Sequence, residues 1–346
     1  PKYIAEELLR QNSDYQLVWD VKTAYPTSDY PMGLKFVRHN TYEFYKELAS
    51  AKVIIENTNI VERLYAYKTK EQFLLQTWHG SLGIKRLDGD VVLGFRWKQL
   101  AKRCQKTVDY LLSNSNFETE VFRTAYWKDV PSILVGHARN DIFFIKDKEK
   151  VARINKKVHR FLNIDEDTHI FLFAPTHRDD VDESYQPLNY EMIKEALEER
   201  FGGKWQIVIR LHNRLKKESR SWLNLLPSYV SDATFYEDMQ ELLLCTDVGL
   251  TDYSSWIFDF VLSGKPGFII ELNLEDYENA RGFYYPIDTT PFPIAMNSEE
   301  LAANIRKFDA EKYEKDKDVF LAARGCMEDG HASERIVEKI NELMAK

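Results

Sequence analysis

The chain is poor in cysteine. Its 346 residues include only Cys104, Cys245 and Cys326, which lie far apart and form no Cys-x-x-Cys pair. A disulfide framework or a structural zinc site needs more cysteines, or closer ones, so we expect neither and assign the chain to a reducing compartment. No apolar run approaches the roughly 20 residues of a transmembrane helix, and no signal peptide follows Pro1. The sequence therefore favours a cytoplasmic protein.

Several familiar motifs are absent as well. The sequence has no GxxxxGK[ST] loop, no GxGxxG fingerprint, no GxSxG elbow and no HExxH helix. These absences weigh against ATP hydrolysis, dinucleotide redox chemistry, α/β-hydrolases and a metal site on a helix. The net charge of -8 argues against a nucleic-acid binder, although it is compatible with a local basic patch for phosphate or lipid head groups.

Short apolar runs alternate with amphipathic helical stretches along the whole chain. Helical periodicity predicts helices at 41–49, 117–125, 190–200 and 238–245. The apolar runs predict strands at 16–21, 52–56, 73–77, 110–113, 133–136, 169–174, 206–211, 247–251 and 267–271. Continuous apolar strands are typical of parallel sheets buried on both faces, and the alternation predicts an α/β fold. The charged stretch 146–157 separates two series of strands, so we expect domains at 1–145 and 146–346.

Ligands of such domains bind at the carboxyl ends of the strands. His79 follows the strand at 73–77, beside Gly80 and shortly before Lys85. An imidazole in this place suits a general base or a hydrogen-bond donor to phosphate. The alternative is an ordinary turn that contains a hydrogen-bonded histidine.

Two strands of the second half also end in polar residues that include an arginine and a histidine. The set comprises Thr176, His177, Arg178, Arg210 and His212. The planar guanidinium of arginine matches phosphate oxygens, and histidine adds a shorter donor. The alternative is a solvated surface. A metal bound by His79, His177 and His212 with Asp179 would draw ligands from loops of both domains, so we expect no metal and no other cofactor.

Hydroxyl and carboxylate side chains follow the strand at 247–251. Asp252, Ser254 and Ser255 are residue types that favour helix N-caps, and an apolar helix pattern comes next. A helix start offers N–H groups to an anion, so this turn predicts a phosphate or diphosphate site, or simple capping. Arg281 beside a glycine is a further candidate for a phosphate contact. Asn140, Asp141 and Ser333 are the remaining cleft candidates; for Ser333 the alternative is a plain helix start.

Taken in order, these segments resemble the CDP-glycerol:poly(glycerophosphate) glycerophosphotransferase family. The matching pieces span roughly residues 75–335; each piece alone is weak evidence for the family, but the ordered set is specific. They are Trp78-His79-Gly80, 136–141, 174–180, 210–212, 251–255, Phe258-Asp259, Lys265-Pro266, 281–283 and 329–333.

The resemblance implies a GT-B-like architecture of two Rossmann-like domains that face a cleft, with the last helix packing back on the first domain. It implies a CDP-polyol donor on the second domain. The acceptor would be a lipid-linked saccharide or polyol-phosphate polymer at the inner membrane face, in teichoic acid or capsule synthesis. His79 would be the base and His212 a phosphate-stabilising partner, while Arg210, Ser254, Ser255 and Arg281 would hold the diphosphate. The family's polymerases carry a further N-terminal region, which favours a transferase that adds one or a few units here.

The basic stretch 95–106 carries aromatic and apolar positions at helical spacing. It predicts either a helix that lies on an anionic bilayer or an ordinary surface helix. Two other functions stay open: a GT-B glycosyltransferase that uses a sugar nucleotide, and a non-catalytic module that binds an anionic polymer. The histidines and arginines at the strand ends favour an enzyme.

Overall fold

A computed structural model describes residues 1–11, 14–22, 30–58, 68–83, 85–87, 90, 99, 106–176, 188–211, 227–271 and 282–346. The chain divides into two compact units. The first unit comprises Pro1–Gly80, Arg86–Phe144 and Arg324–Lys346, and the second comprises Ser81–Lys85 and Ile145–Ala323. The short segment Ser81–Lys85 thus belongs to the second unit, although the chain on both sides of it belongs to the first.

The first unit contains a four-stranded parallel sheet of order β3-β4-β5-β6 and a separate parallel pair, β1-β2. Its strands are β1 (Val18–Val21), β2 (Lys35–Arg38), β3 (Val53–Glu56), β4 (Phe73–Gln76), β5 (Tyr110–Ser113) and β6 (Ser132–Leu134). Its helices are α1 (Lys2–Arg10), α2 (Tyr42–Ser50), α5 (Asn116–Ala125), the 3-10 helix η3 (Ala138–Phe144) and α13 (Ala332–Met344).

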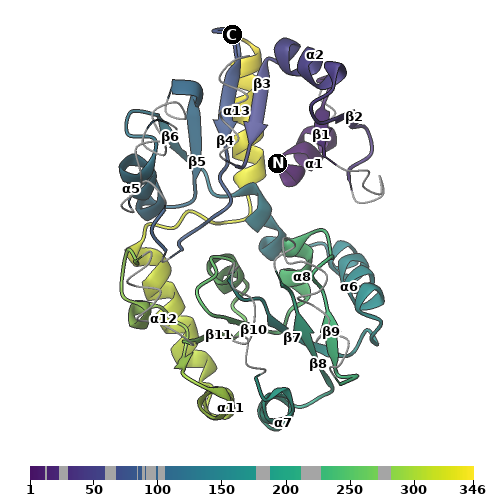
Figure 1. Cartoon of the computed structure of the whole chain (residues 1–346), viewed down its shortest axis with the longest axis vertical. Helices are drawn as coiled ribbons and strands as arrows, with labels where there is room; N and C mark the ends of the chain where they lie inside the picture. The colour runs from purple at the N-terminus through teal and green to yellow at the C-terminus, as the bar shows by residue number, and fades with distance from the viewer. Residues whose placement is uncertain are drawn as a thin grey trace. The chain divides into compact units, whose positions relative to one another are not determined.

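The last helix, α13, supplies part of the core of the first unit. Ile336, Ile340 and Leu343 recur at helical spacing and are buried against α1 and the strands β4 and β5. Figure 1 shows α13 running beside β3 and β4. Because each such side chain stabilises a fold by about 1.5–3 kcal/mol when fully buried, this helix is an integral element of the first unit.

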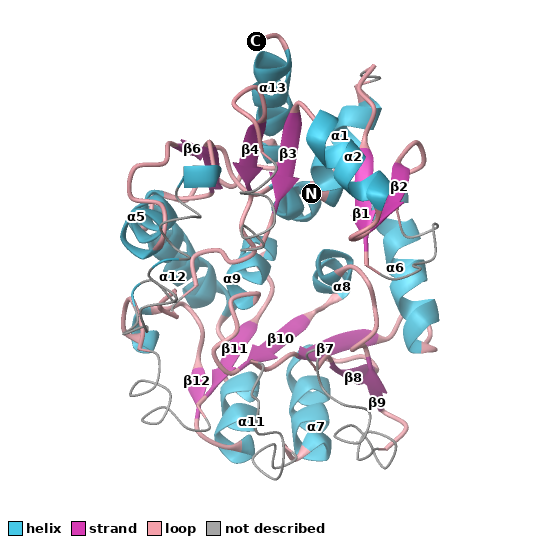
Figure 2. Ribbon diagram, turned by 45° about the horizontal axis from the view of Figure 1, so that its top comes forward, coloured by secondary structure: helices cyan, strands magenta, loops and turns pink. Residues whose placement is uncertain are grey.

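The second unit is built on a six-stranded parallel sheet of order β12-β11-β10-β7-β8-β9. Its strands are β7 (His169–Phe173), β8 (Trp205–Ile209), β9 (Val230–Asp232), β10 (Val248–Thr251), β11 (Gly267–Ile270) and β12 (Ile294–Ala295). Its helices are α6 (Lys148–Leu162), α7 (Tyr190–Phe201), α8 (Met239–Cys245), α9 (Ile257–Phe260), η5 (Val261–Ser263), η6 (Ile287–Thr289), α11 (Ser298–Arg306) and α12 (Ala310–Ala323). Figure 2 shows α7 and α11 side by side on one face of the sheet and α8 on the other.

The α/β fold with parallel sheets is confirmed, and all nine expected strands are present to within two residues at their ends. The short strands β2, β9 and β12 did not stand out in the sequence, because few apolar residues mark them. The charged stretch 146–157 is mostly helix α6, which buries only Val158, His159 and Leu162 and exposes its charges. The chain passes from the first unit to the second just before this helix, between Phe144 and Ile145.

Candidate active site

Gln76, the last residue of β4, holds the loop that follows this strand. The amide of Gln76 is fully buried; its Oε1 accepts the Trp78 N–H at 2.8 Å, and its Nε2 donates to the Thr58 carbonyl at 3.0 Å. Trp78 has a φ of 53°, a left-handed conformation rare for a bulky residue. Its ring packs edge-on against Trp127, 5.4 Å between centroids. Such a backbone costs about 1–3 kcal/mol and is found most often at functional sites.

His79 follows directly and is exposed. Its Nδ1 lies 2.7 Å from the carbonyl oxygen of Asn57, and its ring packs on that of Trp78 with centroids 4.2 Å apart. A carbonyl only accepts, so Nδ1 carries the proton and a neutral His79 has its lone pair on Nε2. The guanidinium of Arg139 donates to the Gly80 carbonyl and fixes the next peptide. This is the arrangement that a general base requires.

Three residues that hold this loop were missed in the sequence: Asn57, Gln76 and Arg139. Asn57 follows β3, which pairs with β4, so parallel pairing brings both strand ends to one edge. Arg139 lies inside the family-like segment 136–141, and this resemblance was the sequence feature that could have identified it as a site residue. Its contact with Gly80 spans 59 residues of sequence.

In the second unit, Asp252 joins two loops at the carboxyl edge of the sheet. Its carboxylate is 1% exposed, and Oδ1 accepts from the backbone N–H and from the hydroxyl of Thr176, both at 2.7 Å. It also accepts the Tyr253 N–H at 2.6 Å. The buried carboxylate therefore locks the loop after β7 to the loop after β10.

The expectation that Asp252 and the two serines cap a helix was wrong. Helix α9 begins only at Ile257, its N-cap is Trp256, and it spans four residues. Asp252 turns inward to Thr176 instead, because a buried carboxylate is stabilised by several donors at once. Ser254 and Ser255 lie half-buried in the turn between β10 and α9, so any phosphate contact would come from their side chains and the turn rather than from a helix start at Asp252.

The segment Ser81–Lys85 brings a cation to the same edge. Lys85 Nζ donates to the hydroxyl of Thr176 at 2.9 Å, and Lys85 forms an antiparallel bridge with Phe283. A Cβ placed on Gly83 would lie 3.1 Å from the Cβ of Ser255, so the two backbones approach closely. The hydroxyl of Tyr285 donates to the carbonyl of Leu82. The Lys85 ammonium and the Asp252 carboxylate therefore bond to the same hydroxyl, that of Thr176.

Arg210, at the end of β8, has contacts within the protein. Its Nη1 donates to the carbonyls of Ala233 and Tyr236 at 3.1 and 2.6 Å, which fixes the loop after β9. Burial lowers the pKa of the guanidinium, although arginine stays charged in proteins. Contact of Arg210 with a diphosphate remains a prediction. The sequence candidates His177, Arg178, His212 and Arg281 lie outside the described residues, as does nearly all of the basic stretch 95–106.

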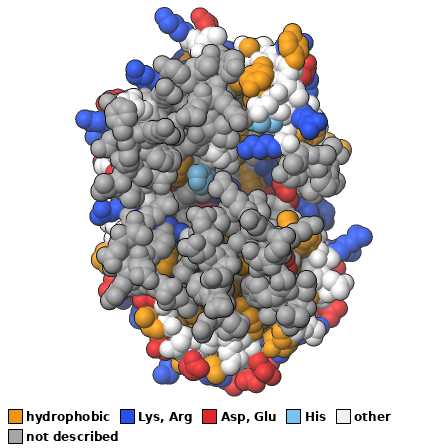
Figure 3. Space-filling model, viewed as in Figure 1, with side chains coloured by type: hydrophobic (Ala, Val, Ile, Leu, Met, Phe, Trp, Pro, Cys, Tyr) orange, Lys and Arg blue, Asp and Glu red, His pale blue; other side chains and the backbone are white. Residues whose placement is uncertain are grey.

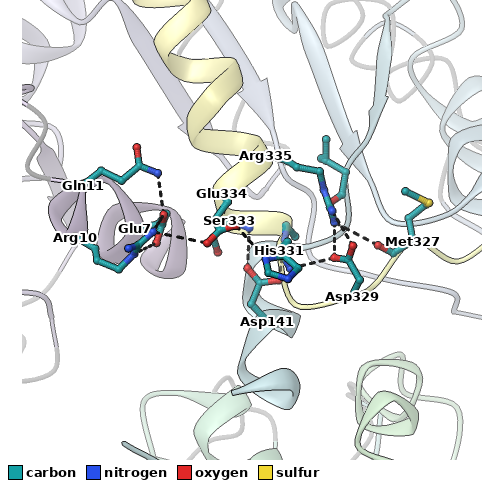
Figure 4. A network of polar contacts seen from close by, with 12 residues as sticks. Glu7, Arg10, Gln11, Asp141, Met327, Asp329, His331, Ser333, Glu334 and Arg335 are labelled. Carbon is teal, nitrogen blue, oxygen red and sulfur yellow. Dashed lines mark hydrogen bonds and ion pairs between the residues drawn. The ribbon is translucent and has the colours of Figure 1, made fainter. Parts of the chain in front are cut away.

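Three other cleft candidates have partners inside the first unit. Asn140 is fully buried and donates to Glu328 Oε1 at 2.8 Å. The carboxylate of Asp141 accepts the N–H groups of Ala332 and Ser333 at 3.0 and 2.7 Å, which caps α13 (Figure 4). Burial raises the pKa of Asp141 despite these bonds. These contacts give Asn140, Asp141 and Ser333 a role in folding that requires no ligand.

The family-like segment 329–333 sits in the same network. Arg335 donates to both oxygens of Asp329, at 2.8 and 2.7 Å, and its Nε donates to the Val135 carbonyl at 3.0 Å (Figure 4). These bonds lower the pKa of Asp329 to about 2. The segment therefore anchors the start of α13 to the end of the first unit's sheet.

Other features of the described residues mark no second centre. They contain no group of three His, Cys, Asp or Glu side chains placed to hold a metal. No helix among them is long and apolar enough to cross a bilayer. Cations and anions are interspersed on the described part of the face in Figure 3. A cavity of about 470 Å³ lies at the amino ends of β7 and β10, beside His169 and Asp247, at the edge opposite to Thr176 and Asp252.

Comparison with known proteins identifies the family. The model of the CDP-Glycerol:Poly(glycerophosphate) glycerophosphotransferase family matches residues 1–342. The chain belongs to this family. It is 28% identical to a teichoic acid poly(glycerol phosphate) polymerase of Staphylococcus epidermidis over 99% of its own length and 48% of that protein. It is 30% identical to a teichoic acid glycerol-phosphate transferase of Staphylococcus aureus, covering 96% of this chain and 87% of that one.

The solved structures agree with this assignment. The wall teichoic acid polymerase TagF matches with a TM-score of 0.80 and 27% identity, over 99% of this chain and 85% of that one. HepE of Anabaena, in complex with UDP-glucose, matches with a TM-score of 0.55 at 9% identity, which shows the fold alone. These matches confirm the GT-B-type fold expected for this member of the glycerophosphotransferase family. The chain spans only about half of the S. epidermidis polymerase.

Proposed function

We propose that this chain transfers a polyol phosphate from a CDP-activated donor to a hydroxyl of a lipid-linked acceptor, in teichoic acid synthesis. Membership of the glycerophosphotransferase family supports the reaction class. The observation that carries the proposal is the exposed His79, whose Nδ1 is bound by the Asn57 carbonyl so that Nε2 has the lone pair. A rigid loop that presents a proton acceptor is what this transfer requires.

The chemistry follows from that geometry. The acceptor hydroxyl gives its proton to Nε2 of His79 while its oxygen forms a bond to the β-phosphorus of the donor. The bond between this phosphorus and the bridging oxygen breaks, and CMP leaves with the electron pair. Phosphoryl transfer depends on alignment and charge stabilisation more than on covalent help. Lys85, Ser254 and Ser255 are proposed to stabilise the diphosphate, together with Arg210.

Chain connectivity supports joint action of the two parts. His79 belongs to the first unit and Ser81 to the second. Only one residue separates them, so their Cα atoms lie within about 7.6 Å of one another. We propose that the base and the donor-binding groups act on one substrate, with the CDP moiety held by the second unit.

The finer assignments extend the same proposal. The relatives include transferases named for glycerol phosphate and for ribitol phosphate, and we propose glycerol phosphate as the unit transferred here. We propose an acceptor held in the membrane and a peripheral location at its inner face. A capsular polymer is the alternative destination of the product.

The test is product analysis with the full chain. CDP-glycerol and CDP-ribitol are each incubated with a lipid-linked disaccharide, with and without a polyol-phosphate primer, and nucleotide products are separated. We expect CMP release matched by polyol phosphate on the acceptor. Release of UDP or CDP from sugar nucleotides would instead indicate a glycosyltransferase. Binding of an anionic polymer without nucleotide turnover would indicate a non-catalytic module.

A further inference from the structure

We infer that Gln76 is a positioning residue for catalysis by His79; this rests on the proposed function. The Gln76 side chain is 0% exposed and bonds to two different loops. Its Oε1 accepts the N–H of Trp78, the neighbour of His79, at 2.8 Å. Its Nε2 donates to the carbonyl of Thr58, the neighbour of Asn57, at 3.0 Å. Because the Asn57 carbonyl binds Nδ1 of His79, a single amide holds both the histidine and the group that orients it.

The bonds of Gln76 continue the link between β3 and β4 past the end of the sheet. Glu56 and Gln76 are paired in register, and the Thr77 N–H donates to the Glu56 carbonyl at 2.7 Å. The chain then leaves the strand direction, since Trp78 has the left-handed φ of 53°. The amide of Gln76 reaches the second residue after each strand. It therefore fixes how far apart the two loops lie.

The partners of Gln76 require an amide in this place. An N–H group needs an acceptor and a carbonyl needs a donor, and the amide supplies one of each. The Asn57 carbonyl can accept from Nδ1 of His79 in both charge states of the imidazole, so the same geometry serves before and after proton transfer. A misplacement of about 1 Å in such a group can cost about 100-fold in rate. Gln76 is fully buried, so it acts on the rate through His79 and not by contact with a substrate.

Gln72 is a matched control at the other end of β4. It is 4% exposed, its Nε2 donates to two backbone carbonyls at 2.8 and 2.6 Å, and its Oε1 accepts a backbone N–H at 2.9 Å. Gln72 is thus also a buried amide that ties segments of the first unit together, but it precedes β4, whereas His79 follows it. Replacement of Gln72 measures what the loss of a buried amide does to stability without a change next to His79.

The first test measures kcat and donor affinity of the full chain with CDP-glycerol and a lipid-linked acceptor. We expect Gln76→Leu to lose about 10- to 100-fold in kcat. It should bind CDP-glycerol as wild type does, because the proposed donor-binding groups belong to the second unit. Gln72→Leu should lose similar stability in urea unfolding and keep its kcat. Nitrogen NMR of His79, assigned by comparison with His79→Ala, should show a protonated Nδ1 in wild type and a mixture of tautomers in Gln76→Leu.

Gln76→Glu adds a dependence on pH. A protonated carboxyl can accept the Trp78 N–H and donate to the Thr58 carbonyl, as the amide does, whereas a carboxylate places an oxygen against that carbonyl. Burial favours the protonated form of a carboxyl group. We therefore expect the ratio of kcat in Gln76→Glu to that in wild type to be highest at about pH 5 and to fall as the pH rises toward about 9. The ratio for Gln72→Glu should not change with pH.

The outcomes separate this inference from the proposed function. Wild-type kcat and an unchanged His79 tautomer in a folded Gln76→Leu protein would overturn the inference and leave the proposed function intact. Equal losses of kcat in Gln76→Leu and Gln72→Leu would show that Gln76 has only a structural role, as would a ratio for Gln76→Glu that is constant with pH. If the wild-type chain releases no CMP, the proposed function is wrong, and the His79 tautomer in Gln76→Leu then decides whether Gln76 orients this histidine.

Discussion

Replacement of Asp141 separates a folding role from a ligand role. The carboxylate accepts the N–H groups of Ala332 and Ser333, which are 0% and 8% exposed. Asp141→Ala leaves two buried donors without their acceptor, at about 1–3 kcal/mol each. We expect a loss of about 2–6 kcal/mol in the free energy of unfolding. Asp141→Asn keeps one acceptor oxygen and should lose about half as much.

Asp147→Ala is the matched control. Asp147 caps α6 in the same way, since its carboxylate accepts the N–H groups of Glu149 and Lys150 at 2.9 and 3.0 Å, but it is exposed. Water replaces the lost acceptor there, so we expect about 0.5–1 kcal/mol. Urea unfolding followed by circular dichroism measures both. Equal losses for Asp141→Ala and Asp147→Ala, or a stable Asp141→Ala protein that has lost donor affinity, would refute the folding role.

Two further predictions concern charged groups. Lys85→Met should weaken CDP-glycerol binding by about tenfold in calorimetry, because it removes the cation beside Thr176. Lys85→Arg keeps the charge and should keep most of the affinity. Equal binding by Lys85→Met and wild type would remove Lys85 from the donor site. The bonds from Arg335 lower the pKa of Asp329 to about 2, so the stability they contribute is full above about pH 4 and is lost as the pH falls toward 2. Arg335 and Asp329 are 27% and 50% exposed, so solvent screens the pair, and Asp329→Asn should cost less than about 1 kcal/mol at pH 7 and clearly less at pH 2. A loss that is the same at both pH values would contradict this assignment.

Local patterns in the sequence predicted most of the fold. Continuous apolar runs such as 170–173 and 207–209 marked buried parallel strands, because burial on both faces leaves no polar alternation. Helix α6 was less evident, since its exposed face carries most of the charged stretch 146–157. The shortest edge strand, β12, has two residues and no periodicity to detect.

The site was predictable in its residue types but not in its contacts. The sequence pointed to His79, Thr176 and Asp252 at strand ends, and the structure brings Thr176 and Asp252 together. Local spacing suggested a helix cap for Asp252, whereas its main partner lies 76 residues away. For the same reason nothing local showed that Ser81–Lys85 folds with the second unit. Contacts of this length depend on tertiary packing, which short patterns do not encode.

The most direct test of the central claim is turnover by His79→Ala. CMP release from CDP-glycerol with a lipid-linked acceptor is measured beside donor affinity, with His331→Ala as the control, since His331 is an exposed histidine of the first unit near Glu334. We expect His79→Ala to bind CDP-glycerol as wild type does and to lose at least about 100-fold in kcat, while His331→Ala keeps its rate. Wild-type turnover by a folded His79→Ala protein would contradict the account.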